Sequence, residues 1–404
     1  MADGNPLRVL AVDEEVPFPL NTGKRLRTFN LLRRLQERHR ITWVCYGDLP
    51  EGLPALPNVD LVTLKSPLIP QQGPAFYLAL LRNVLSPLPY VVDRHYSAAM
   101  RETIAGLLGR ESYDLLYCEW TPYTRVLADF LDGYPSVLST HNVEALIWQR
   151  LRETEANLAK KLYIGLQCRK MFHFEKQAVG HYTAVTAVSD PDRQLLAEWY
   201  GADQATVVPN GVDEACFVPR DEPVLPGSMV FTGSMDWRPN QDAMKFFLNE
   251  IYPLVLKELP GASLAIVGRQ PPAWLSEMAT RFPNVTVTGT VADVRPHIAT
   301  AALYIVPLRI GGGSRLKILE ALAMEKIVLS TGIGAEGLDL ADGKDLLLAD
   351  GAAAFARTAV DVLKRREAYL PLAAAGRWRV LDSYTWGAIA NVMDGVWRRA
   401  AGQG

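Results

Sequence analysis

The sequence has few features of a secreted, membrane-spanning or disulfide-rich protein. Its 404 residues include only four cysteines, which are scattered without paired spacing. This usage argues against a disulfide framework or a cysteine-based zinc site and fits reduced thiols. No stretch approaches the roughly 18 apolar residues that a membrane span needs. The N-terminus lacks a charged start followed by an apolar core, so we expect no secretory signal and a cytoplasmic protein.

Charge and motif absences exclude further classes of function. The formal net charge is −2, which provides no overall attraction to nucleic acid, so we expect no nucleic-acid partner. The first expected strand is followed by DEEVPFPLNTG rather than G-x-G-x-x-G, which argues against a redox Rossmann enzyme. No acidic metal-binding motif is present, so no metal ligands are predicted.

Positive charge is nevertheless concentrated in residues 24–40. One interpretation is a solvated helix face. The other is a surface that attracts anionic lipid or an anionic acceptor, which would place the protein at the inner face of the cell membrane. The cations are Lys24, Arg25, Arg27, Arg33, Arg34, Arg38 and Arg40.

Apolar runs of strand length alternate with helical patterns throughout the chain. In the first half they occupy residues 7–13, 41–47, 59–65, 113–119, 135–141 and 182–189. In the second half they occupy residues 228–234, 262–268, 284–290, 302–308 and 326–331. Continuous apolar strands that alternate with helices predict parallel sheets covered on both faces, an α/β architecture.

The length of the chain and a proline-rich linker predict two domains. A chain of 404 residues is too long for one ordinary core. Residues 207–227 form the linker, and we expect domains at 1–216 and 217–382, followed by a C-terminal helix at 383–404. Doubly wound domains bind ligands beyond the carboxyl ends of their strands, so we expect two such domains that face each other across a cleft.

A long helical pattern over residues 143–179 carries apolar side chains at an approximate helical period. We interpret these side chains as core; a wall that faces the acceptor is the alternative. They are Trp148, Leu151, Leu158, Leu162, Tyr163, Leu166 and Phe172.

The most informative segment is Val306 to Leu338. Three glycines, residues 311–313, follow an apolar strand, and Ser314 stands where a helix N-cap is expected. Unpaired N–H groups at a helix start attract anions, whereas the helix dipole disfavours cations there. Arg315 and Lys317 in this first turn therefore indicate a bound anion, for which a diphosphate is the natural candidate.

Glu320 lies nearly two turns further along the same helix, in an otherwise apolar stretch. A carboxylate that accepts hydrogen bonds from ribose hydroxyls would explain its presence. A salt bridge to Lys317 or to another local cation is the alternative.

Several motifs together resemble glycosyltransferase family 4, the retaining group 1 glycosyltransferases. They are GGGSRLKILEALAM, STGIGAEGL, VVPNGVD, VFTGSMDWRPN, GTVADVRP and STHNVE. The resemblance covers almost the whole chain and implies the GT-B fold, in which two Rossmann-like domains face a central cleft. The first domain would bind the acceptor and the second the nucleotide sugar, and the last helix would pack back on the first domain.

The resemblance also implies a reaction. It implies retaining transfer of a sugar from a UDP- or GDP-sugar to a hydroxyl of a glycan, lipid or small molecule, without a cofactor or metal ion. Bacterial polysaccharide or glycoconjugate biosynthesis is the implied setting. Two other functions stay open: a nucleotide-sugar epimerase or hydrolase of the same fold, and a catalytically silent nucleotide-sugar-binding subunit.

The sequence departs from the family pattern at two places. Of the two glutamates that the family has eight positions apart, Glu320 matches the second, while Gly312 occupies the place of the first. The family's arginine after the glycine of the TGSMDWRPN segment is Ser234 here. We therefore expect Arg315 and Lys317 to neutralise much of the diphosphate charge.

The resemblance assigns roles to individual residues. The catalytic group is His141, expected to contact the transferred sugar, with Arg315 and Lys317. The predicted donor-binding residues are Gly23, Gly233, Ser234, Arg238, Thr290, Val291, Gly312, Gly313, Ser314, Leu316, Glu320 and Glu336. The predicted acceptor-binding residues are Glu119, Asn142 and Glu144, with a capping or packing role as the alternative for Glu119.

Overall fold

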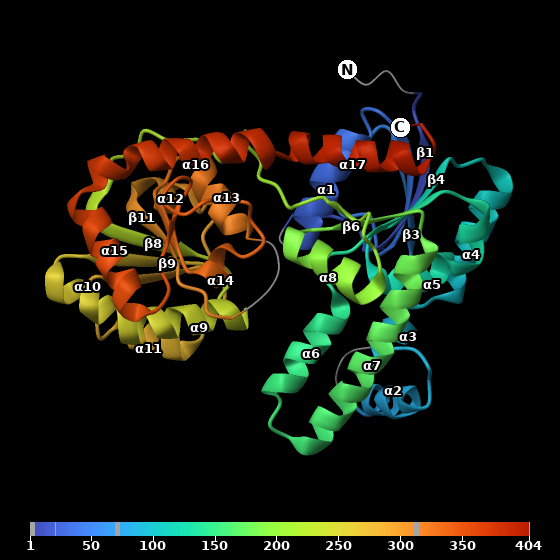
Figure 1. Ribbon diagram of the computed structural model, residues 1–404, viewed down its shortest axis with the longest axis horizontal. Coiled ribbons are helices and arrows are strands. Elements are labelled where there is room, and N and C mark those ends of the chain that lie inside the picture. The colour runs from blue at the N-terminus through green and yellow to red at the C-terminus, as the bar shows by residue number, and fades with distance from the viewer. Residues whose placement is uncertain (1–4, 21, 69–72, 311–314, 404) are drawn as a thin grey trace. The chain divides into compact units, whose positions relative to one another are not determined.

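The computed structural model describes residues 5–20, 22–68, 73–310 and 315–403 and divides the chain into two units (Figure 1). The first unit comprises residues 1–209 and 389–404, and the second comprises residues 210–388. These boundaries lie near the expected ones at 216/217 and 382/383. The second unit begins at residue 210, a few residues before the expected boundary, and Val212 donates its backbone N–H to the carbonyl of Tyr384 in that unit at 2.9 Å.

The first unit contains a seven-stranded sheet in which every neighbouring pair is parallel. The strand order is β3-β2-β1-β4-β5-β6-β7. The strands are β1 (Arg8–Glu15), β2 (Arg40–Tyr46), β3 (Val59–Leu64), β4 (Leu115–Cys118), β5 (Ser136–Ser139), β6 (Ala184–Ala187) and β7 (Thr206–Val207). The order reverses between β1 and β4, which is where open parallel sheets bind their ligands.

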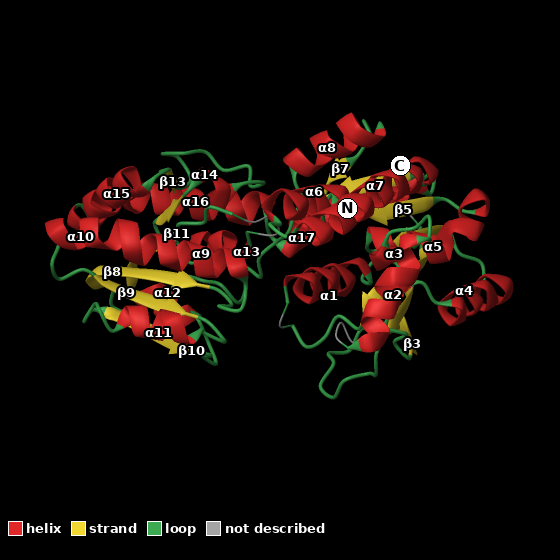
Figure 2. Ribbon diagram, turned by 90° about the horizontal axis from the view of Figure 1, so that it is seen from below, coloured by secondary structure: helices red, strands yellow, loops and turns green. Residues whose placement is uncertain are grey.

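Helices cover both faces of this sheet, as the second view shows (Figure 2). They are α1 (Gly23–Leu35), α2 (Pro74–Val84), α3 (Tyr90–His95), α4 (Ala98–Arg110), α5 (Thr124–Leu127), α6 (Glu144–Thr154), α7 (Leu158–His181), α8 (Asp190–Tyr200) and most of α17 (Trp386–Ala400), with short 3-10 turns at Thr121–Tyr123 and Ala128–Gly133. Thr22 caps α1 by accepting the N–H of Arg25 at 3.3 Å, which satisfies one of the open donors at the helix start.

The long helix predicted over residues 143–179 is two helices, α6 and α7, that form an antiparallel hairpin (Figure 1). The break is at residues 155–157, because Asn157 caps a new helix by accepting the N–H of Lys160 at 3.1 Å. The prediction that the apolar side chains of this stretch pack in the core is wrong for four of them. Leu151, Leu158, Leu162 and Phe172 are exposed.

Several cations of the basic segment at residues 24–40 have partners inside the first unit. Lys24 forms ion pairs with Asp13 and Glu14, and the buried Arg27 donates to the carbonyls of Val208 and Pro209. These two cations satisfy acceptors within the first unit, whereas Arg33 and Arg40 are exposed, so contact of the segment with an anionic membrane stays a prediction. The partners of Arg27 lie more than 180 residues away in the chain, where sequence patterns do not reveal them.

The second unit contains a six-stranded sheet, again with every neighbouring pair parallel. The strand order is β10-β9-β8-β11-β12-β13, which reverses between β8 and β11. The strands are β8 (Leu225–Thr232), β9 (Ser263–Val267), β10 (Val285–Gly289), β11 (Ala301–Val306), β12 (Val328–Ser330) and β13 (Leu347–Leu348). Strand β11 is buried along its whole length, as expected for a central strand covered on both faces.

The helices of the second unit again lie on both faces of its sheet. They are α9 (Arg238–Phe246), α10 (Tyr252–Glu258), α11 (Ala273–Ala279), α12 (Arg295–Thr300), α13 (Leu316–Ala323), α14 (Gly332–Ala335), α15 (Ala352–Lys364) and α16 (Leu370–Ser383), with a π-helical turn at Phe247–Ile251 and a 3-10 turn at Arg366–Tyr369. In the part of the chain that the structure describes, no helix has the length and apolar character needed to cross a membrane.

The end of α17 packs against the first unit through a buried polar and aromatic cluster. Asp394 accepts from His39 Nε2 at 2.8 Å and from Arg398 Nε at 2.8 Å. Beside it, the fully buried Trp397 ring lies 5.5 Å from the ring of His39 and 5.1 Å from that of Tyr117. The C-terminal helix is therefore part of the core of the first unit.

We predict that Trp397→Ala destabilises the first unit by about 3–5 kcal/mol, because it removes a large side chain from a packed interior. The free energy of unfolding can be measured by urea denaturation followed by circular dichroism. Trp378→Ala on α16 is the matched control, because Trp378 is 68% exposed and its loss should change stability by about 0.5 kcal/mol or less. Equal effects of the two substitutions would contradict the proposed anchoring.

Candidate functional site

In the first unit, charged residues gather where β1, β4 and β5 end. Asp13 and Glu14 lie at the end of β1, Glu119 directly follows β4, and His141 follows β5. The carboxyl ends of parallel strands meet at one edge of the sheet, and β1 and β4 flank the point where the strand order reverses. This edge is the ligand-binding position that the fold predicts.

His141 is held by a buried carboxylate. Its Nε2 lies 2.9 Å from Oε1 of Glu119, and this oxygen lies 3.9 Å from Arg27 Nε. The other oxygen, Oε2, accepts a hydrogen bond from the hydroxyl of Tyr117. Burial lowers the pKa of His141 below its usual value, although Glu119 opposes this shift. Burial would raise the pKa of Glu119, but the hydrogen bond and charge of His141, together with Arg27, lower it to about 2.

Lys24 is enclosed by acids at the same edge of the sheet. Its Nζ lies 2.8 Å from Asp13 Oδ1, 2.9 Å from Glu14 Oε2 and 5.0 Å from the ring centroid of Trp120. Burial raises the pKa of Asp13 to about 7, even though the nearby ammonium lowers it. The charge of Lys24 is therefore balanced within the protein.

In the second unit, Lys317 reaches from α13 to the end of β8. Its Nζ donates to Asn240 Oδ1 at 2.8 Å and lies 4.1 Å from the ring centroid of Phe231. Gly233 permits this approach, since a Cβ there would lie 2.8 Å from the Lys317 amine and 2.7 Å from Asn240 Nδ2. The glycine thus makes room for a cation at the ligand-binding edge of the sheet.

The Lys317 side chain is half-buried, and its amine has no ion-pair partner among the described residues. Among the described residues, no carboxylate lies within 4.0 Å of its Nζ. Burial lowers its pKa to about 7; Glu320 raises it and Arg315 lowers it further. A buried ammonium without an ion-pair partner is unfavourable unless an anion arrives, so the position favours an anionic ligand.

Glu320 is half-buried on the same helix. Burial raises its pKa to about 7, although Lys317 lowers it. Within the described residues the Glu320 carboxylate forms neither an ion pair nor a hydrogen bond, so the alternative of a salt bridge to Lys317 is not supported. The carboxylate remains available to a ligand.

Comparison with known proteins identifies the family. Residues 23–215 match the family described as Glycosyltransferase Family 4, and residues 226–365 match the family described as Glycosyl transferases group 1. The chain belongs to glycosyltransferase family 4. A relative described as an uncharacterized 44.6 kDa protein in the cps region of Klebsiella pneumoniae is 22% identical over 368 residues, which cover 88% of this chain and 91% of the relative.

Solved glycosyltransferase structures share the fold of this family 4 enzyme. Sucrose-phosphate synthase from Thermosynechococcus elongatus superposes with a TM-score of 0.73 at 16% identity, and 98% of this chain and 100% of that chain are covered. Anabaena HepE in complex with UDP and glucose superposes with a TM-score of 0.65 at 13% identity, with 96% and 99% covered. The two parallel sheets with their flanking helices therefore have the GT-B architecture, as the sequence predicts.

Two of the three predicted acceptor residues of this glycosyltransferase form hydrogen bonds with other residues of the first unit. Glu119 is buried and orients His141. Glu144, the first residue of α6, is also buried and accepts from the indole N–H of Trp120 at 2.8 Å. Both carboxylates thus have partners inside the protein, Asn142 is half-buried, and contact of any of the three with an acceptor stays a prediction.

Arg315 has partners within the protein, which the sequence did not predict. It occupies the N-cap position of α13, where Ser314 was expected, and donates through Nη2 to the carbonyl of Ile333 at 2.8 Å. The same nitrogen lies 3.5 Å from Oε2 of Glu336, and the Arg315 side chain is buried. Arg315 therefore links the start of α13 to α14, and any contact with a donor would be additional to this structural role.

For the remaining residues predicted to bind the donor, the structure gives their positions in the fold. Arg238 is exposed at the start of α9, Leu316 is half-buried at the start of α13, and Gly23 is the first residue of α1. Thr290 and Val291 follow β10. Gly312, Gly313 and Ser314 lie outside the described residues. Their contacts with a donor stay predictions.

One cation at the ligand-binding edge of the second sheet was not predicted from the sequence. Arg269, two residues after β9, donates through Nε to Ser234 Oγ at 2.8 Å and is itself exposed. Gly268 brings the two loops together, because a Cβ at that position would lie 1.8 Å from the carbonyl oxygen of Gly233. The available signal was the sequence IVGRQ, in which an arginine follows the glycine that ends an expected strand.

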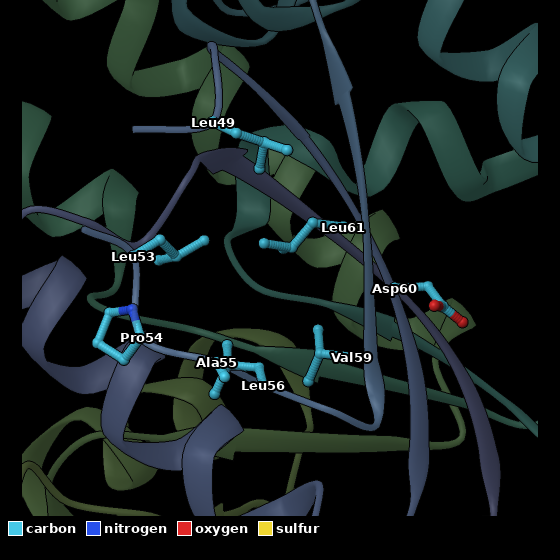
Figure 3. Close-up of a pocket in the computed structure, with 8 residues that line it drawn as sticks. All are labelled: Leu49, Leu53, Pro54, Ala55, Leu56, Val59, Asp60 and Leu61. Carbon is cyan, nitrogen blue, oxygen red and sulfur yellow. The ribbon is translucent and has the colours of Figure 1, made fainter. Parts of the chain in front are cut away.

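A hollow of about 350 Å³ lies elsewhere in the first unit, beside edge strand β3 (Figure 3). Its lining is mainly leucine, alanine and proline, with Asp60 as the charged residue. None of the predicted site residues lines it. It is therefore separate from the candidate active site.

We predict that Glu119→Gln lowers the pKa of His141 still further, because the carboxylate is the group that opposes the effect of burial. The pKa can be measured by NMR titration of histidine labelled with ¹³C. Glu111→Gln, which removes an exposed carboxylate of the same unit, should leave the His141 titration unchanged. An unchanged His141 pKa in Glu119→Gln would contradict the assigned pairing.

Proposed function

We propose that this glycosyltransferase moves a sugar, with retention of anomeric configuration, from a UDP- or GDP-sugar to a hydroxyl of a carbohydrate, lipid-linked or small-molecule acceptor. The observation that carries the proposal is the half-buried Lys317 amine, which has no ion-pair partner among the described residues. We place the reaction in the cytoplasm and in bacterial polysaccharide or glycoconjugate biosynthesis. The relative from a cps region supports that setting.

Lys317 is proposed to bind the diphosphate of the donor. An anion beside the amine would provide the negative charge that the surrounding protein lacks, and it would raise the pKa of Lys317 from about 7. Arg269, on the loop after β9, and Arg238, at the start of α9, are both exposed and supply further positive charge. The HepE structure that contains UDP and glucose supports a uridine nucleotide as a candidate.

The proposed chemistry is a front-face displacement. The bond between the anomeric carbon and the diphosphate oxygen breaks, and the acceptor oxygen bonds to the same face of that carbon. The acceptor proton passes to an oxygen of the departing diphosphate, so no protein nucleophile is needed. Lys317 stabilises the negative charge that develops on the leaving group, which is the electrostatic contribution expected of a preorganised cation.

His141 is proposed to orient the transferred sugar. Because its pKa lies below the usual value, the imidazole is neutral near pH 7 and carries one N–H. Glu119 accepts that N–H at Nε2. Nδ1 is then an acceptor, suited to a hydrogen bond from a sugar hydroxyl rather than to nucleophilic attack.

We further propose that the reaction requires neither a metal ion nor another cofactor. In nucleotide-sugar chemistry a metal neutralises the leaving diphosphate. Lys317, with the arginines around it, provides positive charge at the corresponding place in the second unit. Activity that persists after exhaustive treatment with a chelator is the expected result.

A donor library with detection of released nucleotide tests the proposed function. With the correct donor and acceptor we expect turnover, and Lys317→Ala should lower it by about 10²–10³-fold, because it removes one preorganised charge from the leaving group. Lys245→Ala is the control, since Lys245 lies on α9 of the same unit and packs over the ring of Trp274 on α11. Nucleotide release without acceptor would identify a hydrolase, and conversion of the donor sugar would identify an epimerase.

We predict that Glu320→Gln weakens binding of the free nucleoside diphosphate by about tenfold or more. The ionised carboxylate is proposed to accept from both ribose hydroxyls, and hydrogen bonds to a charged group are worth about 1.5–3 kcal/mol. Isothermal titration calorimetry can measure this change. Glu325→Gln, just beyond the end of α13, should bind like the wild type. Unaltered affinity in Glu320→Gln would overturn the ribose assignment but not the diphosphate site.

A further inference from the structure

An unusual group of exposed apolar side chains lies on α2 and α7 of the first unit. Of the six most exposed large apolar side chains in the described chain, five are on α2, at its C-cap or on α7, and the sixth is Trp378 in the second unit. We call these five the apolar surface: Tyr77, Leu81, Leu85, Leu158 and Leu162. Single exposed leucines are ordinary, but a group of this kind marks an interaction site.

The apolar side chains of α2 form one continuous stripe. At about 100° per residue, Tyr77, Leu78, Leu81, Val84 and Leu85 fall within about a third of the helix circumference. All five are exposed, and Leu85 is 91% exposed. Helix α2 thus presents its apolar stripe outward, the reverse of a helix that packs on a protein core.

Helix α7 carries the second part of the surface. Leu158 and Leu162 are one turn apart and are 77% and 76% exposed. Lys170 of the same helix donates to the carbonyls of Asn83 and Val84 at 2.6 and 3.4 Å, which joins the end of α2 to α7. In Figure 1 the turn between α6 and α7 and helix α2 lie at the same end of this unit.

The charges around the apolar surface have one predominant sign. Residues 149–170 contain six lysines and arginines against two glutamates, and residues 73–85 contain Arg82 and no acid. The chain as a whole has a net charge of −2, so this positive region is a local feature. Exposed apolar side chains with cations close to them in sequence suit a lipid bilayer that has hydrocarbon in its interior and anionic head groups at its surface.

We propose that the apolar surface and its flanking cations bind the first unit to an anionic lipid bilayer. The leucines and Tyr77 would enter the boundary between head groups and acyl chains, while lysines and arginines such as Lys160 and Arg169 remain at the level of the lipid phosphates. This site differs from the basic segment at residues 24–40, in which Lys24 and Arg27 have partners inside the unit. The proposal is independent of the transferase activity, because binding to vesicles requires neither donor nor acceptor.

Flotation of the full-length chain with lipid vesicles tests the proposal. Vesicles of phosphatidylcholine with about 30% phosphatidylglycerol should bind the protein, vesicles of phosphatidylcholine alone should bind it weakly, and about 0.5 M salt should release it. Leu81→Ser with Leu85→Ser, and separately Leu158→Ser with Leu162→Ser, should each lower the partition coefficient by about tenfold or more.

Matched controls separate lipid binding from damage to the fold. Leu49→Ser with Leu225→Ser changes two exposed leucines outside the surface and should bind vesicles like the wild type. Lys160→Gln with Arg169→Gln should lower binding only to anionic vesicles, by about fivefold for each charge. Thermal unfolding should be unchanged in every variant, because all these side chains are exposed.

Three outcomes would overturn the proposal. One is a wild-type chain that does not float with anionic vesicles. Another is equal loss of binding in the control pair and in the Leu81→Ser with Leu85→Ser pair. The third is a dimer detected by light scattering that this pair abolishes without effect on lipid binding, which would assign the surface to a second copy of the chain.

Discussion

The candidate donor site depends on one electrostatic constraint, a half-buried ammonium group that has no ion-pair partner among the described residues. Lys317 is held by the amide of Asn240 and the ring of Phe231, and no carboxylate of the described chain lies within 4.0 Å. An amide oxygen and an aromatic face orient a cation but do not balance its charge. The absence of a side chain at Gly233 is what allows the amine to reach the end of β8.

The cations of the first unit illustrate the opposite arrangement. Lys24 has two carboxylates within 3 Å, and Arg27 donates to two carbonyls. These side chains stabilise the ends of β1 and β4, and breaking such buried pairs is strongly unfavourable. A buried cation therefore indicates a ligand site only when its partners inside the protein are missing, which is a property of the fold and not of the residue type.

This distinction explains how much could be predicted from the sequence. The alternation of apolar strands and helices predicts two parallel sheets, and the position of Lys317 at a helix start predicts its role, because both signals are local. The partners of Arg27 could not be predicted, since Val208 and Pro209 lie more than 180 residues away in the chain. The same holds for Glu119, whose contact with His141 depends on β4 and β5 being neighbours.

The break between α6 and α7 shows a different limit of periodicity. An approximate 3.6-residue period at Leu158 and Leu162 indicates a helix with an apolar face, but it does not show what that face contacts. A cap at Asn157 turns the chain back and leaves both leucines in solvent. The period therefore predicts the helix, whereas the exposure of Leu158 and Leu162 follows from how α6 and α7 pack, which no local pattern shows.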